Sequence, residues 1–185
     1  MNAAMWVLII AIALIVIGAL ASYNGLVKLR LQTANAWSQI DIQLKRRYDL
    51  IPNLVETVKG YMKFEQETLQ KVVESRNMAL SAKSVGDKAA AEQQVSTSLT
   101  GLFAIAEQYP DLKANQNMLS LQEELKSTEN KISFARQYYN DITTAYNTKL
   151  QTFPSSIVAG MGGFTARELF ELDEPAAREV VKVQF

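Results

Sequence analysis

The chain contains neither cysteine nor histidine among its 185 residues. It therefore has no imidazole base, no thiolate nucleophile and no zinc site of the usual Cys/His type. A four-helix di-iron site in its usual form is excluded too, because that site needs two Glu-x-x-His pairs. Disulfides and lipid-modified cysteines are impossible. The absence of cysteine does not indicate whether the chain lies in the cytoplasm or in the periplasm. We expect no metal and no cofactor.

Charged side chains are missing from the first 27 residues, and residues 3–21 form an almost unbroken apolar run. About 20 apolar residues in a helix, rising about 1.5 Å each, cross the hydrocarbon core of a bilayer. The competing interpretation is a cleaved secretory signal, favoured by the A-x-A-like site at 19–21. The run lacks a basic n-region, however, and exceeds the usual apolar core of about 7 to 15 residues. We therefore expect residues 1–27 to be an uncleaved transmembrane anchor.

The flanks of this run predict its orientation. No basic side chain precedes it, whereas Lys28 and Arg30 follow it closely. By the positive-inside rule the membrane-flanking Lys28 and Arg30 place the rest of the chain in the cytoplasm. Two basic residues are a modest signal, so a periplasmic domain is the alternative.

Positive and negative charges balance, with 19 Lys and Arg against 19 Asp and Glu. Nucleic-acid binding requires a strongly basic surface, so no nucleic-acid partner is expected. The roughly 160 residues after the anchor suffice for one domain with a sizeable core.

Helical periodicity dominates this remainder. Apolar residues recur at steps of three and four over 40–62, 95–109 and 121–153. The predicted fold class is all-α: an N-terminal transmembrane helix continues into an antiparallel bundle of long helices over 28–153.

The anchor and the first bundle helix are predicted to be one rod from about Ala3 to at least Tyr48. No proline interrupts this stretch, and Gly25 costs only about 1 kcal/mol relative to Ala. Pro52 then marks either a bend or the start of a second helix.

Residues 154–185 form a third, irregular region. Ser155–Gly163 contains three glycines and is predicted to be a loop, while Thr165–Glu168 has the capping-box form of a short helix. The last five residues, 181–185, alternate apolar and polar side chains, which indicates a strand.

A lone strand leaves its backbone groups unpaired, and a second copy of the chain is the simplest cover for that edge. Val181, Val183 and Phe185 are therefore candidate partner-binding residues in a homo-oligomer. A frayed tail, or a segment folded back on the bundle, is the alternative. The anchor also carries two pairs of small residues spaced for close helix approach, Gly18 with Ser22 and Ala21 with Gly25.

Two long segments, YNGLVKLR at 23–30 and AWSQIDIQLKRRYDLIPNLVE at 36–56, closely resemble the LemA family. The resemblance continues in ENKISFARQYYN at 129–140, in Tyr146-Asn147, in Phe153-Pro154 and in Gly163-Phe164. It implies a bacterial inner-membrane protein with a short N-terminal tail, one membrane helix and an antiparallel helical domain. It implies no enzymatic activity.

Lys45, Arg46 and Arg47 form the strongest local charge cluster. In a continuous helix Lys45 lies more than about 20 Å beyond Arg30, several Debye lengths from its own membrane. The cluster is interpreted as a solvated or intrahelically ion-paired face, with a partner-binding patch as the alternative.

Other polar residues carry weaker signals. Adjacent carboxylates at 123–124 and 173–174 diverge on a helix, so no acid-base pair is predicted. Four asparagines inside helical patterns predict buried hydrogen bonds between helices, with a small-molecule site as the alternative: Asn24, Asn53, Asn140 and Asn147.

These observations favour a non-enzymatic, membrane-anchored helical scaffold of the cell envelope that contacts itself or other envelope proteins. The second hypothesis is an accessory subunit that binds a ligand or supports a membrane protease or transporter, and a hidden hydrolase is third. A polar cavity would favour the second hypothesis, and a large apolar face the first.

Overall fold

The structure is a computed structural model that describes residues 2–62 and 65–171. Within these residues it contains helices and no strand, so the all-α prediction is confirmed. The predicted strand, with Val181, Val183 and Phe185, lies outside the described residues. The chain divides into two compact units, one formed by Met1–Asp41 with Ser133–Leu169, the other centred on Ile42–Ile132.

Helix α1, Ala3–Lys59, is one continuous helix of 57 residues. The predicted rod is therefore confirmed, and it extends beyond Tyr48. Pro52 lies inside α1, so no second helix starts there. Side chains 3–21 are all exposed, and burial starts after the apolar run. The run thus presents apolar surface on every side, as a membrane helix does.

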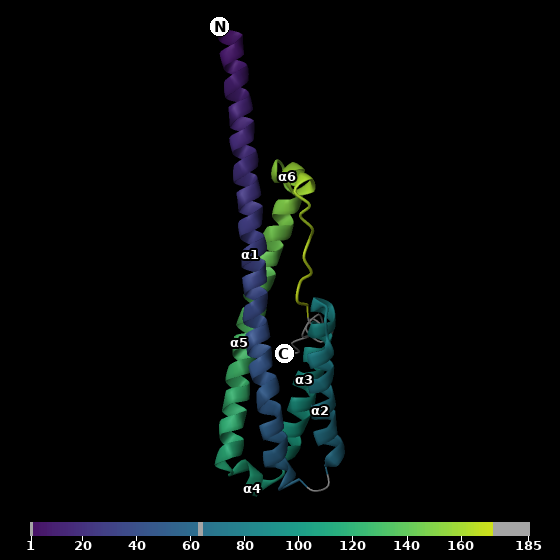
Figure 1. Cartoon of the computed structure of the whole chain (residues 1–185). Helices are drawn as coiled ribbons and strands as arrows, with labels where there is room; N and C mark the ends of the chain where they lie inside the picture. Colours follow the sequence, from purple (N-terminus) through teal and green to yellow (C-terminus); the bar gives the residue numbers. More distant parts are fainter. Residues whose placement is uncertain (1, 63–64, 172–185) are drawn as a thin grey trace, which may run out of the picture. The chain divides into compact units, whose positions relative to one another are not determined.

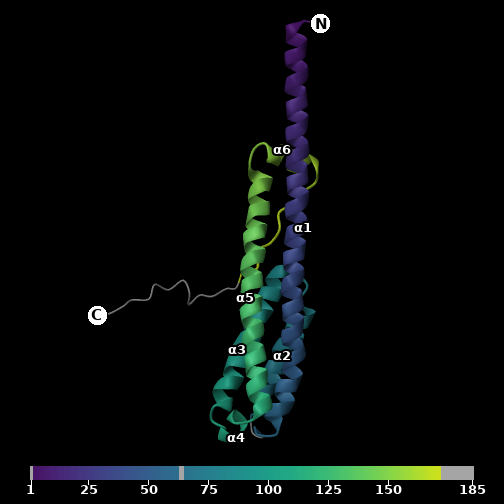
Figure 2. The same ribbon diagram turned by 90° about the vertical axis from the view of Figure 1, so that its left-hand side faces the viewer.

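The first unit pairs the early part of α1 with the end of α5, Gln116–Gln151. The rings of Trp37 and Tyr139 lie 5.4 Å apart, whereas Leu26 packs with Tyr146. The higher-numbered residue of α1 meets the lower-numbered residue of α5, so the two segments are antiparallel. Short helix α6, Ser155–Met161, then returns to α1, where Ala159 joins the cluster of Leu26 and Tyr146 (Figures 1 and 2).

Two predictions for this region are wrong. Ser155–Met161 is helical rather than a loop. Thr165–Glu168 is extended rather than helical, because its backbone is bonded elsewhere. Asn147 Nδ2 donates to the Arg167 carbonyl at 2.8 Å, and the Arg167 N–H donates to Asn147 Oδ1 at 2.9 Å. The Tyr139 hydroxyl donates to the Glu168 carbonyl at 2.8 Å.

The second unit is a four-helix arrangement. It contains the end of α1, α2 (Gln66–Ser81), α3 (Val85–Ala106), the short α4 (Pro110–Lys113) and the start of α5. The connections are short, so consecutive long helices are antiparallel neighbours, and Figure 1 shows α2 and α3 side by side. The core side chains come from all four long helices and include Leu44, Ile51, Leu54, Val72, Val95, Leu102, Met118 and Leu125.

Candidate functional site

Arg47 is the buried centre of a charge network in the second unit, of which Glu129 is half exposed. Its side chain is only 5% exposed. Its Nη1 lies 3.3 Å from Glu92 Oε2 on α3 and 2.8 Å from Glu129 Oε2 on α5. Its Nη2 donates to Ser96 Oγ at 2.9 Å. One guanidinium on α1 therefore joins α3 and α5, which suits its fixed fork of donors.

The carboxyl of Glu92 is as deeply buried as Arg47, with a side chain 5% exposed. The Tyr48 hydroxyl donates to Glu92 Oε1, so both carboxylate oxygens have partners. Burial raises the pKa of Glu92, and it outweighs the opposite effects of the Tyr48 hydrogen bond and the Arg47 charge. Arg47 and Tyr48, which are adjacent on α1, thus each donate to a different oxygen of the Glu92 carboxyl.

A hollow of about 290 Å³ lies beside this network and includes Arg47, Ser96 and Glu129 in its lining. Such a hollow next to a carboxyl of raised pKa is a candidate for acid-base chemistry. Here, however, both oxygens of Glu92 are bound within the protein. The arrangement is therefore suited to locking three helices together.

The predicted interpretation of the charge cluster is wrong for Arg47. Arg47 is neither solvated nor paired within its own helix, since its partners lie on α3 and α5. Arg46 is half exposed and lies 3.8 Å from Glu124 of α5, and Lys45 is exposed. A partner-binding patch therefore stays a prediction for Lys45 and Arg46, whereas the buried Arg47 offers no free surface.

Sequence reasoning missed Glu92, although a signal was present. Glu92 lies three residues after Ala89 and three before Val95, both buried. A carboxylate on the apolar stripe of a helix requires a buried partner. The spacing from Ala89 and Val95 places Glu92 on that stripe and so marks it as a buried, paired residue.

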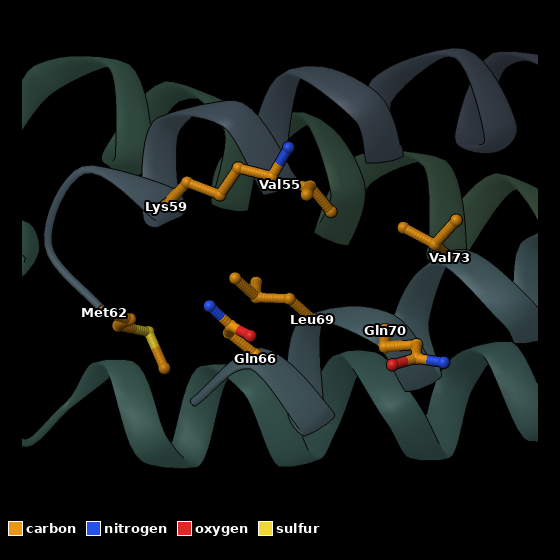
Figure 3. Close-up of a pocket in the computed structure, with 7 residues that line it drawn as sticks. All are labelled: Val55, Lys59, Met62, Gln66, Leu69, Gln70 and Val73. Carbon is orange, nitrogen blue, oxygen red and sulfur yellow. The ribbon is translucent and has the colours of Figure 1, made fainter. Parts of the chain in front are cut away.

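An apolar hollow of about 650 Å³ lies between the end of α1 and the start of α2 in the same unit. Figure 3 shows Val55 and Lys59 facing it from α1 and Leu69 and Val73 from α2. Gln66 and Gln70 add polar groups to its lining. It combines apolar walls with one lysine, which is typical of a small-molecule site.

A longer groove of about 810 Å³ follows α2 and α3. Four of its twelve lining residues are small: Ser75, Ala90, Ser98 and Gly101. A Cβ added at Gly101 would meet nothing within 4 Å. Small side chains let another helix approach closely, so the groove is a candidate protein-contact surface.

The membrane flank belongs to the first unit. Trp6 and Tyr23 are exposed on α1 and lie about 26 Å apart along a helix that rises about 1.5 Å per residue. This separation matches the aromatic residues found at the two faces of a bilayer. Lys28 and Arg30 are both exposed, and Arg30 Cζ lies 5.2 Å from the centre of the Phe164 ring.

The prediction of buried hydrogen bonds between helices is wrong for Asn147, whose hydrogen bonds are exposed. Asn147 binds the backbone of Arg167 with both ends of its amide, and it fixes an extended segment rather than a neighbouring helix. Asn24 and Asn53 are exposed, so the prediction of buried hydrogen bonds is wrong for them.

The two pairs of small residues in α1, Gly18 with Ser22 and Ala21 with Gly25, differ in environment. A Cβ added at Gly25 would run into the Lys149 ammonium, whereas one added at Gly18 would meet nothing within 4 Å.

Residues 36–185 match the model of the LemA family. The chain belongs to the LemA family. A relative named Protein LemA from Metamycoplasma hominis is 33% identical over 138 residues, which is 74% of this chain and 63% of the relative. The chain thus spans less than two thirds of that protein's length.

Two further relatives are the magnetosome proteins MamQ 1 and MamQ 2 of Paramagnetospirillum magneticum. Each is 21% identical over 201 residues, covering 95% of this chain and 74% of the relative. The relatives' names denote no enzymatic activity. Helix α1 is long and apolar enough to cross a membrane. This LemA family member is thus a helical protein whose N-terminal helix is compatible with a single-pass anchor.

Proposed function

We propose that this LemA family protein is a non-enzymatic scaffold of the bacterial inner membrane. It is anchored by one transmembrane helix and acts through contacts with its own copies and with other envelope proteins. The observation that carries the proposal is the continuity of α1 from Ala3 to Lys59. The helix that crosses the membrane is also the first helix of the four-helix unit, so the anchor and that unit share one element.

The distribution of buried charge supports a structural role. Arg47 of α1 binds both Glu92 of α3 and Glu129 of α5. Among the described residues, no group of three or more His, Cys, Asp and Glu side chains could hold a metal ion. A well-locked bundle with an open groove along α2 and α3 suits recognition of another helix better than turnover of a substrate.

Cytoplasmic placement of the bundle is part of the proposal. Lys28 and Arg30 are exposed on α1 just after the apolar run. Exposed cations at this end of the span are favoured on the cytoplasmic side.

Site-specific cross-linking tests the contact surface, since a chain without cysteine accepts a single engineered thiol. We would introduce Met78→Cys, on the groove wall, and Glu123→Cys, an exposed control on α5. With a thiol-attached photocross-linker in native membranes, the Met78 variant should give discrete adducts that the control lacks. Identical patterns for both variants would contradict use of the groove.

Self-association is tested separately by light scattering of the full chain in mild detergent. A mass above that of one copy is expected, and a monomer would contradict self-association. Deleting residues 180–185 then tests the predicted C-terminal joint. An unchanged oligomer would exclude that joint.

A second candidate function is an accessory subunit that binds an apolar ligand, favoured by the hollow in Figure 3. Its apolar walls suit a long-chain carboxylate such as oleate, whose head group would displace Glu56 Oε1 from its place 2.6 Å from Lys59 Nζ. Val73→Trp should fill the hollow and abolish oleate binding, measured by calorimetry. Equal binding by the variant, or no binding by the wild type, would contradict this function.

A further inference from the structure

Helix α6 carries an exposed apolar face. Ile157 and Met161, four residues apart on this helix, are 57% and 87% exposed, and Phe153 just before it is 81% exposed. The opposite side of α6 is packed, since Ala159 and Val158 join the cluster around Leu26. Large exposed apolar side chains gathered on one short, uncharged helix indicate a surface that something covers.

The position of α6 identifies what covers it. Ala159 packs with Leu26 of α1, five residues after the apolar run ends at Ala21. Figures 1 and 2 both show α6 beside α1, with the first turns of α1 continuing beyond it. If the apolar run spans the bilayer, α6 therefore lies at the level of the headgroups.

The charges around α6 fit an anionic surface. Between residues 3 and 40, and again between residues 142 and 167, the sequence contains no Asp or Glu. The same stretches supply four cations: Lys28, Arg30, Lys149 and Arg167. The end of the Lys149 side chain lies against Gly25 of α1, and Arg30 lies over the Phe164 ring. Glu168 directly follows Arg167 and offsets its charge, whereas lipid phosphates attract the other three cations, Lys28, Arg30 and Lys149.

We propose that α6 lies in the headgroup interface of an anionic phospholipid bilayer, with Phe153, Ile157 and Met161 inserted at the acyl boundary. Apolar faces of interfacial helices enter that zone to a depth of about 5–10 Å. A seven-residue helix binds weakly alone, but α1 holds it at the surface, which makes the contact effectively intramolecular. This inference depends on the proposed membrane anchoring of α1.

Depth measurement in vesicles tests the proposal. Single cysteines would be introduced into the full chain as Ile157→Cys and Met161→Cys, each labelled with an environment-sensitive fluorophore. Phe134→Cys is the matched control, because this exposed aromatic residue of α5 lies in the same unit, about 26 Å along the helix from its last residue, Gln151. Leu14→Cys, within the apolar run, reports the anchor itself.

In vesicles of phosphatidylcholine with phosphatidylglycerol, lipids brominated near the carbonyl should quench most of the fluorescence at 157 and 161, and little at 134. Omitting phosphatidylglycerol should weaken this quenching, and an unchanged signal would overturn the role of the cations. Lipids brominated deep in the acyl chain should quench the label at 14, which lies near the middle of the apolar run. Quenching at 14 by these lipids without quenching at 157 and 161 by the shallow ones would overturn the proposal alone. No quenching at 14 by the deep lipids would overturn the anchor as well. If neither brominated lipid nor aqueous iodide quenches the labels at 157 and 161, a protein covers α6, and this result would overturn the proposed insertion in the bilayer.

Discussion

The Nε of Arg76 on α2 donates to the backbone carbonyl of Tyr48 on α1 at 2.8 Å. This carbonyl lies four residues before Pro52, whose nitrogen carries no hydrogen to donate. A side chain from another helix therefore takes the place of the missing helical hydrogen bond. Helix α1 continues to Lys59 with the partly buried Tyr48 carbonyl satisfied.

Replacing Arg76 should lower the free energy of unfolding, because Pro52 cannot donate to the Tyr48 carbonyl in its place. Arg76→Met keeps the apolar stem but leaves the Tyr48 carbonyl without this donor, and a buried unsatisfied group costs about 1–3 kcal/mol. We expect the free energy of unfolding to fall by about that amount. Urea titration followed by circular dichroism of the detergent-solubilised chain measures it.

Pro52→Ala supplies the matched control, because Pro52 is exposed and alanine restores the backbone N–H. Removing a proline from a helix interior recovers up to about 3 kcal/mol. In the Pro52→Ala background, Arg76→Met should cost clearly less than in the wild type. Equal costs in both backgrounds would show that Arg76 does not act through this carbonyl.

Arg47→Met should be strongly destabilising. It leaves Glu92 buried without its cation, and loss of one partner of a buried pair costs about 3–5 kcal/mol. Arg46→Met is the control, since its half-exposed pair with Glu124 contributes about 0–1 kcal/mol. Denaturant titration compares the two, and similar losses would contradict the central role of Arg47. Adding Glu92→Gln to Arg47→Met should recover part of the lost stability.

The buried carboxyl of Glu92 predicts a pH dependence. Its folded-state pKa is raised above the ordinary value of 4.5, so the folded chain keeps a proton that the unfolded chain releases. As pH rises through that window, the Glu92 contribution to the free energy of unfolding therefore falls. Wild type should lose stability relative to Glu92→Gln between about pH 4.5 and the higher folded pKa. A difference independent of pH would contradict the raised pKa.

The orientation prediction depends on Lys28 and Arg30. A reporter that is active only in the cytoplasm, fused after Phe185, should be active in cells. A periplasm-only reporter fused at the same point is the control and should stay silent. Activity of the periplasmic reporter would reverse the proposed orientation.

Much of the fold could be predicted from local patterns. An apolar run without charge or proline predicted the first part of α1, and apolar residues spaced three and four apart predicted the long helices of the bundle. The α6 region was predicted wrongly, because three glycines suggested a loop. Packing of Ala159 on Leu26 holds this segment as a helix, and that long-range contact leaves no mark on local sequence.

The candidate site was harder to predict for the same reason. Lys45, Arg46 and Arg47 are equally charged in the sequence, yet only Arg47 is buried, with partners on both α3 and α5. Which of three consecutive helical residues is buried depends on the rotation of α1 within the bundle, and the partners Glu92 and Glu129 are 45 and 82 residues away.

The sequence by itself determined the long apolar start of α1, the helical class and the exclusion of Cys and His chemistry, because each depends on composition or on spacing within one helix. Only the tertiary structure decided that α1 passes Pro52, that Arg47 is buried, and that α6 turns an apolar face outward beside α1. Each of these depends on a partner distant in the chain, whether the Arg76 side chain, the two carboxylates or Leu26. A linear pattern does not encode which of many chemically possible partners will meet.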